Sequence, residues 1–361
     1  MVQSCMSLAG SLQQHRTVYV VTRDRDLGSS SAYEDIQPDT WNHFGNNIQV
    51  LYLSPQNLRY KTIKNVIEEI QPHCIYLNSM FSPWFTITPL VAKITSKHIS
   101  SKLILAPRGM LHQGAIQFGK LKKRIFFNAF RLSGLQKKIV FHATDVTEVG
   151  DIRKIFGNTT KVRLIKNFPS FQQQPLQYTS KEPGRLRCIF VSRISPKKNL
   201  LYALELLRQI HDIDIELTIV GPVEAQAYWE RCQQIIEQLP ANITVQYKGA
   251  IPAGQLPAIY AAHHLFILPT HGENFGHVIF ESMMCGRPVL ISNQTPWRQL
   301  AGKRAGFDIE LSDEIQYINA IREAAAWNQE QFEGFCRSTW QFANEYITGS
   351  DLKKEYLELF S

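Results

Sequence analysis

The hydrophobic positions of this chain alternate between two patterns. Short apolar runs are followed by longer stretches in which apolar residues recur every three or four positions. The first pattern is typical of buried strands and the second of amphipathic helices. In the first half of the chain they predict strands at 17–21, 48–53, 74–78, 102–106, 139–142 and 163–165, with helices at 60–70 and 87–96. We therefore expect an α/β domain built around a parallel sheet.

The segment 167–184 interrupts the alternation, because it is polar and carries three prolines. Such a composition indicates a linker. The alternation then restarts, with strands predicted at 187–192, 215–220, 243–247, 265–268 and 289–292, and helices at 200–210, 225–238, 255–262 and 278–285. The tail from Asp313 is helical, with breaks near Asn328 and Gly349. We predict two doubly wound domains, 1–168 and 185–340, a linker at 169–184, and a final helix, 341–361, that packs back towards the first domain.

The composition excludes several classes of protein. The 361 residues are 44% hydrophobic and 19% charged, which is typical of a globular protein. No apolar run approaches the roughly 18–20 residues that cross a bilayer, and the first residues do not resemble a signal peptide, so we expect a cytoplasmic protein. The six cysteines are scattered without a Cys-x-x-Cys pair, which argues against a zinc site or a disulfide framework.

The net charge of +8 favours anionic partners. Basic residues and phenylalanines crowd the segment 120–138, and two interpretations of it stay open. An amphipathic basic stretch of this kind could lie on an anionic membrane, or it could be a solvated helix whose phenylalanines face the core. No nucleic-acid motif accompanies the charge, so nucleic acid is not an expected partner.

Two carboxylates, Glu273 and Glu281, lie eight positions apart around a chain break at 274–276, where a helix begins. A loop that enters a helix presents unpaired backbone N–H groups and the positive end of the helix dipole. Carboxylates beside it could hold sugar hydroxyls while the amides hold oxygen or phosphate. The pattern indicates chemistry on a phosphorylated sugar.

A second signal follows the first strand of the second domain. Arg193 and Lys198 lie five positions apart in a basic loop between that strand and a helix. An arginine fork and a lysine point charge could clamp a diphosphate there. The alternative is a solvated basic turn.

These motifs resemble glycosyltransferase family 4 (group 1), whose members have the GT-B fold. The resemblance rests on Ser192-Arg193 followed by Lys198, on Glu273 and Glu281 within GENFGHVIFE, and on Gly286-Arg287-Pro288-Val289. It implies two Rossmann-like domains that face each other across a cleft. It also implies a retaining transfer of a sugar from a UDP- or GDP-sugar to a glycan or lipid-linked acceptor, without a metal or another cofactor. The setting would be bacterial polysaccharide or lipopolysaccharide assembly, in the cytoplasm or on the inner face of the cytoplasmic membrane.

The resemblance assigns roles to the residues of the second, donor-binding domain. Glu281 would bind the ribose hydroxyls, and Arg193 and Lys198 would hold the diphosphate. Glu273 would face the transferred sugar. Backbone groups complete this expected site, with Asn274, Phe275 and Gly276 beside the sugar and Gly249 and Ile251 beside the base.

The first domain would face the acceptor. Its sequence Pro-Arg-Gly-Met-Leu resembles a subgroup of surface-polysaccharide transferases, which places Arg108 and Gly109 in the cleft. The alternative for Arg108 is a structural arginine. The segment around His142 resembles the family's short strand beside the cleft, so His142 is a further candidate.

The beginning of the chain departs from the family. The first strand and its glycine loop have no counterpart, and residues 7–12 resemble the end of the first helix. The absence of an inner strand would expose sheet edges and lower stability. An alternative hypothesis is therefore a truncated relative with weak or no activity that only binds nucleotide or glycan. A GT-B epimerase or phosphorylase and a non-enzymatic binding module are further alternatives, but the sequence lacks the carboxylate and histidine pairs or the pyridoxal-phosphate lysine that the two enzymes need.

Overall fold

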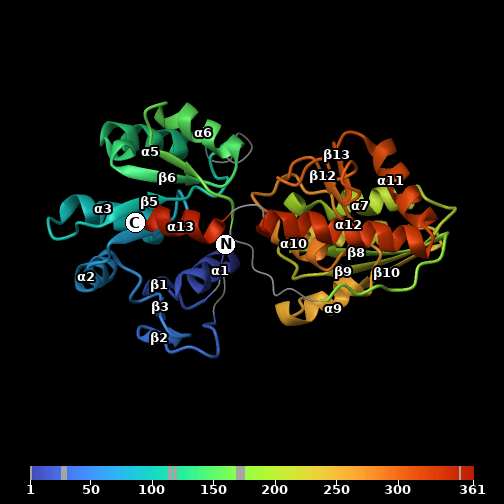
Figure 1. Cartoon of the computed structure of the whole chain (residues 1–361), viewed down its shortest axis with the longest axis horizontal. Coiled ribbons are helices and arrows are strands. Elements are labelled where there is room, and N and C mark those ends of the chain that lie inside the picture. The colour runs from blue at the N-terminus through green and yellow to red at the C-terminus, as the bar shows by residue number, and fades with distance from the viewer. Residues whose placement is uncertain (1, 26–30, 113–115, 117–119, 168–174, 349–350) are drawn as a thin grey trace. The chain divides into compact units, whose positions relative to one another are not determined.

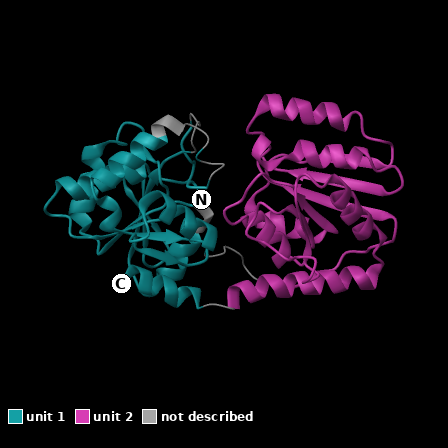
Figure 2. Cartoon of the chain, turned by 90° about the horizontal axis from the view of Figure 1, so that it is seen from above, with its two compact units in different colours: residues 1–170, 351–361 teal, residues 171–350 magenta. Residues whose placement is uncertain are grey.

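The computed structural model describes residues 2–25, 31–112, 116, 120–167, 175–348 and 351–361. The chain divides into two compact units, shown in Figure 2. Unit 1 comprises residues 1–170 and 351–361, and unit 2 comprises residues 171–350. No helix of the described residues has both the length and the apolar character that a membrane span requires.

Unit 1 contains two sheets, of order β1-β3-β2 and β4-β5-β6-β7 (Figure 1). Its strands are β1 (Val18–Arg23), β2 (Trp41–Phe44), β3 (Ile48–Leu53), β4 (Cys74–Leu77), β5 (Lys102–Leu105), β6 (Ile139–Ala143) and β7 (Val162–Leu164). Its helices are α1 (Val2–Leu12), α2 (Tyr60–Ile70), α3 (Thr88–Thr95), α5 (Lys120–Leu132), α6 (Val146–Phe156) and α13 (Leu352–Phe360). All neighbouring strands are parallel except β2 and β3. Strands β1 and β4 each end a sheet.

Helix α1 packs against both sheets of unit 1. Ala9 contacts Ile48 on β3, while Leu8 and Leu12 share a core cluster with Ile104 on β5. Helix α13 joins the same cluster through three buried residues. Residues 351–361 thus pack in the core of unit 1, the unit that also contains α1.

Unit 2 has one six-stranded parallel sheet of order β10-β9-β8-β11-β12-β13. Its strands are β8 (Arg185–Val191), β9 (Asp214–Val220), β10 (Ile243–Tyr247), β11 (Leu265–Leu268), β12 (Val289–Ser292) and β13 (Gly306–Ile309). Its helices are α7 (Leu200–Arg208), α8 (Gln226–Ile236), α9 (Leu256–Ala261), α10 (His277–Met284), α11 (Glu314–Ala326) and α12 (Gln329–Thr348). Helix α7 packs against α8 and α11, and α10 packs against α9 and α12. Two helix layers of this kind cover the two faces of a doubly wound sheet.

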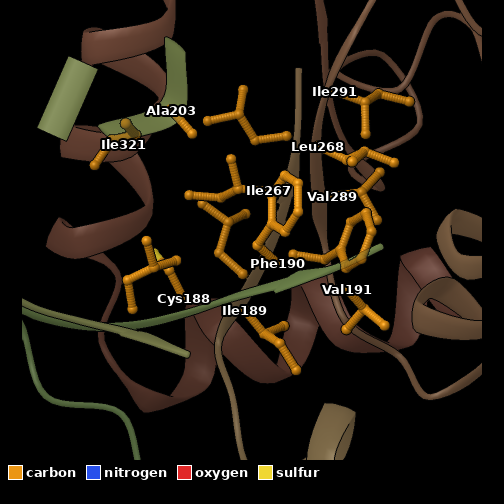
Figure 3. Packing of buried hydrophobic residues seen from close by; sticks show 14 of the residues in the cluster. Cys188, Ile189, Phe190, Val191, Ala203, Ile267, Leu268, Val289, Ile291 and Ile321 are labelled. Atoms are coloured by element: carbon orange, nitrogen blue, oxygen red, sulfur yellow. The ribbon is translucent and has the colours of Figure 1, made fainter. Parts of the chain in front are cut away.

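Strands β11 and β12 of unit 2 are nearly continuous apolar runs, because helices cover both faces of the sheet. Every residue of β11 and β12 is buried. Figure 3 shows side chains of β8, β11 and β12 packed against α7 and α11. This continuous core holds the carboxyl ends of neighbouring strands at one edge of the sheet.

The unit boundaries differ in detail from the domains predicted from the sequence. The described part of the predicted linker, 175–184, packs on unit 2, because Lys181 is buried and its Nζ donates hydrogen bonds to the carbonyl groups of Ala325 and Trp327. The predicted final helix is divided. Residues up to Thr348 continue α12 in unit 2, whereas 351–361 belong to unit 1.

Candidate functional site

The strand order of unit 2 reverses between β8 and β11. The chain adds β9 and β10 on one side of β8, and then returns to add β11, β12 and β13 on the other. In open α/β sheets, ligands bind beyond the carboxyl ends of the strands at such a reversal. The loops after β8 and β11 carry most of the residues that the sequence predicted for the donor site.

The loop after β8 contains both predicted cations. The side chain of Arg193 is 59% exposed and forms an ion pair with Glu224. Lys198 ends a short 3-10 turn and is followed by Asn199, whose positive φ of 62° begins α7. The Nζ atom of Lys198 lies 2.5 Å from Oε1 of Glu273, and these two side chains are only 13% and 11% exposed. The structure therefore joins two predicted site residues that are far apart in sequence.

The loop after β11 contributes backbone more than side chains. Gly276 has φ of 75° and is the residue at which α10 begins. The ring of Phe275 is buried against Trp297, whose Nε1 donates a 2.5 Å hydrogen bond to the Phe275 carbonyl. Phe275 can therefore contact a ligand only through its backbone. Trp297 belongs to the core. The first turn of α10 adds the positive end of its helix dipole.

Glu281 lies one turn into α10 and is 7% exposed. Its carboxylate lies near Tyr260, whose pKa is raised well above its usual value, first by burial and then by the charge of Glu281. A charged group in such a buried position needs polar partners.

The loops after β9 and β10 approach the same edge. The Gly221 N–H donates a 2.8 Å hydrogen bond to the Gly249 carbonyl. A Cβ atom on Gly221 would lie 1.9 Å from the Ser192 carbonyl oxygen, so only glycine fits there, whereas the Cβ position of Gly249 is open. Ile251, also predicted at the site, is partly buried against the core. Gly221 was not among the residues expected at the site, although its place directly after β9 was a signal for it.

The unit 1 candidates form a buried hydrogen-bond network of their own. The guanidinium of Arg108 donates to Asn78 Oδ1 at 2.6 Å, to the Tyr76 hydroxyl at 2.8 Å and to Asn167 Oδ1. This geometry is that of the structural alternative, in which the guanidinium is held by its own unit. The residues lie at the carboxyl ends of β4 and β5.

His142 continues this network without exposure to solvent. Its Nε2 lies 2.9 Å from the Ile165 carbonyl, which only accepts, so Nε2 carries the proton and Nδ1 accepts from the Tyr76 hydroxyl at 2.7 Å. Burial, and then the charge of Arg108, lower the pKa of His142 to about 3. His142 is therefore neutral at physiological pH and has both nitrogen atoms engaged.

Gly109 is held by a carboxylate from the segment that follows His142. Glu148 is fully buried, accepts a 2.7 Å hydrogen bond from the Gly109 N–H, and accepts two more from Thr144. Helix α6 presents this side chain next to its N-cap, Asp145.

Among the residues that the structure describes, no three His, Cys, Asp or Glu side chains gather as metal ligands would. All six cysteines are free thiols. The loops at the strand reversal carry two cations, Arg193 and Lys198, and the carboxylate of Glu273.

Comparison with known proteins places this site in context. The family model described as Glycosyl transferases group 1 matches residues 176–330. O-antigen chain mannosyltransferase B of Escherichia coli is 32% identical over 119 residues, which are 32% of this chain and 30% of that relative. The chain spans less than half of the length of the first curated relatives that it matches.

Solved structures show the same fold. HepE of Anabaena, in complex with UDP and glucose, has a TM-score of 0.65 at 16% identity over 86% of this chain and 85% of that one. WaaG, a glycosyltransferase involved in lipopolysaccharide biosynthesis, has a TM-score of 0.65 at 14% identity over 99% of this chain and 94% of that one. The fold is GT-B, and the α/β class with Rossmann-like units that the sequence predicted is confirmed.

Proposed function

We propose that this chain is a retaining glycosyltransferase, because residues 176–330 match the family model of glycosyl transferases group 1. It transfers a hexose from a UDP- or GDP-sugar to a glycan or lipid-linked acceptor in polysaccharide or lipopolysaccharide assembly. The observation that carries the proposal is the contact of Lys198 with Glu273 at the strand reversal of unit 2. This contact sets a cation for the departing diphosphate beside a carboxylate for the sugar.

The chemistry of transfer explains why these groups belong together. As the bond between the sugar and the diphosphate breaks, negative charge grows on the diphosphate and the sugar becomes oxocarbenium-like. Fixed positive groups directed at the growing charge are expected to give the largest catalytic term. Lys198, the exposed Arg193 beside it, and the amides that begin α10 are the available groups.

The remaining unit 2 residues fit the recognition of a nucleotide. Glu281 is a buried carboxylate suited to bind the two ribose hydroxyls, and Glu273 with the turn at 274–276 faces the sugar. The space around Gly249 allows a base to approach its backbone. A mannosyltransferase among the similar sequences and a UDP complex among the similar structures support a nucleotide-sugar donor.

A ligand panel tests this proposal. We expect UDP-glucose, UDP-N-acetylglucosamine or GDP-mannose to raise the melting temperature of the wild type, and Glu281→Gln to abolish that rise. Glu230→Gln is the matched control, because Glu230 is an exposed residue of α8. If none of these donors stabilises the wild type, the proposal is wrong. Binding without release of nucleoside diphosphate would favour the weak or inactive relative, an alternative that the divided sheet of unit 1 supports.

A membrane surface is the proposed location of the acceptor. Residues 120–167 contain twelve lysines and arginines but only three acidic residues. The net positive charge of this segment therefore exceeds the net charge of +8 of the whole chain. On α5, Phe126, Phe127 and Phe130 pack into the core of unit 1, while Ile125 and Leu132 are 61% and 89% exposed. The side chains of 120–122 lie outside the described residues.

Arg124 and Arg131 are exposed on α5 together with Ile125 and Leu132, and we expect this helix to bind the anionic inner face of the cytoplasmic membrane. The protein should sediment with phosphatidylglycerol vesicles at low salt, less so after Leu132→Ser, and not with phosphatidylcholine vesicles. Equal sedimentation with both vesicles, or with neither, would contradict the membrane part of the proposal.

A further inference from the structure

Thr270 is fully buried between β11 and Glu273, and its hydroxyl connects the two loops of the donor site. Its Oγ1 lies 3.1 Å from the Lys197 carbonyl oxygen and 3.2 Å from Oε1 of Glu273. The Gly272 carbonyl oxygen lies farther away, at 3.4 Å, and the Gly272 N–H donates to the hydroxyl at 3.3 Å. A hydroxyl has one proton to donate, so its three acceptors share it. One side chain thus reaches both the residue that precedes Lys198 and the carboxylate that contacts it.

The backbone around Thr270 extends the connection to a third loop. The Ser292 hydroxyl, at the end of β12, donates a 2.5 Å hydrogen bond to the Thr270 carbonyl. The Glu273 N–H donates a 3.0 Å hydrogen bond to the carbonyl of Gln294 in the loop that follows. Because β8, β11 and β12 are neighbours in the sheet, the loops after all three strands meet around Thr270.

The two oxygen atoms of the Glu273 carboxylate differ in their partners. Oε1 faces both Lys198 and Thr270, whereas Oε2 accepts no hydrogen bond from the described residues. We infer that Thr270 is a positioning residue, which fixes Oε1 beside Lys198 so that Oε2 is presented to a hydroxyl of the donor sugar. The inference rests on the proposed function, because it gives Glu273 and Lys198 their roles.

Three variants separate this role from ordinary packing. Thr270→Val keeps the shape and removes the hydroxyl, and Thr270→Ser keeps the hydroxyl. Thr86→Val is the matched control, because Thr86 is an equally buried threonine of unit 1 whose hydroxyl donates a 2.8 Å hydrogen bond to the Ser79 carbonyl. Both valine variants lose one buried hydrogen bond to a carbonyl group, but only one loses it at the donor site.

We expect Thr270→Val to lower kcat for release of nucleoside diphosphate from the active donor by about 10- to 100-fold, the cost of a slightly misplaced group. The Kd of UDP or GDP should change by less than about threefold, because Lys198 remains. Thr270→Ser should restore kcat, and Thr86→Val should keep it. Hydrogen exchange followed by mass spectrometry should show faster exchange in 270–276 for Thr270→Val alone.

The two readouts distinguish the possible failures. Unchanged exchange in Thr270→Val would refute the connection between the loops. Faster exchange with wild-type kcat, or an equal loss of kcat in Thr86→Val, would refute the positioning role. If the wild type binds none of UDP-glucose, UDP-N-acetylglucosamine and GDP-mannose, the proposed function fails and the catalytic role of Thr270 fails with it, whereas the exchange data still decide the connection.

Discussion

Replacing Glu273 with glutamine is expected to strengthen the binding of a nucleoside diphosphate, even though it removes a group needed for transfer. In the free protein Lys198 Nζ lies 2.5 Å from Glu273 Oε1, and both side chains are nearly buried. A diphosphate that approaches Lys198 therefore meets a cation whose charge is already balanced. It also meets the repulsion of the carboxylate, which the Glu273→Gln variant removes.

Coulomb's law gives the size of this repulsion. Two unit charges about 6 Å apart interact by about 0.7 kcal/mol at the dielectric constant of water, and by about 2.8 kcal/mol at an effective value near 20. A diphosphate carries at least two negative charges. The value for water is the lower bound for each charge, and it gives about 1.4 kcal/mol and roughly tenfold tighter binding.

Isothermal titration with UDP and GDP measures this effect. Kd should fall in Glu273→Gln and rise in Lys198→Met, and both changes should shrink as the salt concentration rises from about 50 to about 500 mM. Glu216→Gln is the control, because it removes the same charge from a pair with Arg185 at 3.5 Å, near the amino ends of β8 and β9. Unchanged or weaker UDP and GDP binding in Glu273→Gln, with Glu216→Gln like the wild type, would refute the reasoning.

Three further predictions concern the two units separately. Gly221→Ala should destabilise unit 2 by more than about 3 kcal/mol, because its Cβ would meet a backbone carbonyl. Gly249→Ala should cost only about 1 kcal/mol, because its φ is positive but the space around it is open. Urea unfolding compares the two variants, and equal losses of stability would contradict the steric argument. Tyr76→Phe should cost about 2–3 kcal/mol in unit 1, because Arg108 loses an acceptor and His142 a donor, yet UDP binding should persist. Because the pKa of His142 is lowered to about 3, the unfolded chain binds a proton below about pH 6.5 that the folded protein does not bind. The free energy of unfolding should therefore fall as the pH falls from about 6.5 to about 3, by up to about 1.4 kcal/mol per pH unit. His142→Gln should reduce this slope, and an unchanged slope would show that other groups cause it.

The sequence predicted most strands of both units because buried parallel strands are nearly continuous apolar runs. Strands β3, β10, β11 and β12 begin and end where the pattern places them. Two strands were not predicted, β2 with the sequence Trp-Asn-His-Phe and β13 with Gly-Phe-Asp-Ile. Each has four residues, mixes polar with apolar side chains, and lies at the edge of its sheet, so neither produces a distinct apolar run.

The sequence located residues at the ends of strands better than it predicted the direction of their side chains. Lys198 and Glu273 are 75 positions apart, and their contact follows from the pairing of β8 with β11, which no local pattern encodes. For Phe275 the sequence predicted a role for the backbone only, and its ring lies in the core. Arg108 follows a strand as predicted, but the polar groups of its own unit attract its guanidinium. In each case the partners come from distant segments, so tertiary packing decides the outcome.

The two units differ in how their cores are built, and this difference separates donor binding from transfer. The buried residues of unit 2 form one cluster that spans its six strands, and this core fixes the loops around Lys198, Glu273 and Thr270. The buried residues of unit 1 fall into separate clusters around two sheets, joined by α1 and α13. Local stability follows the continuity of packing, so the donor loops are better supported than the network around Arg108. Because every proposed contact with the nucleotide comes from unit 2, we expect nucleotide binding to depend on this continuous core, and we expect transfer to depend also on an acceptor held by the divided unit 1.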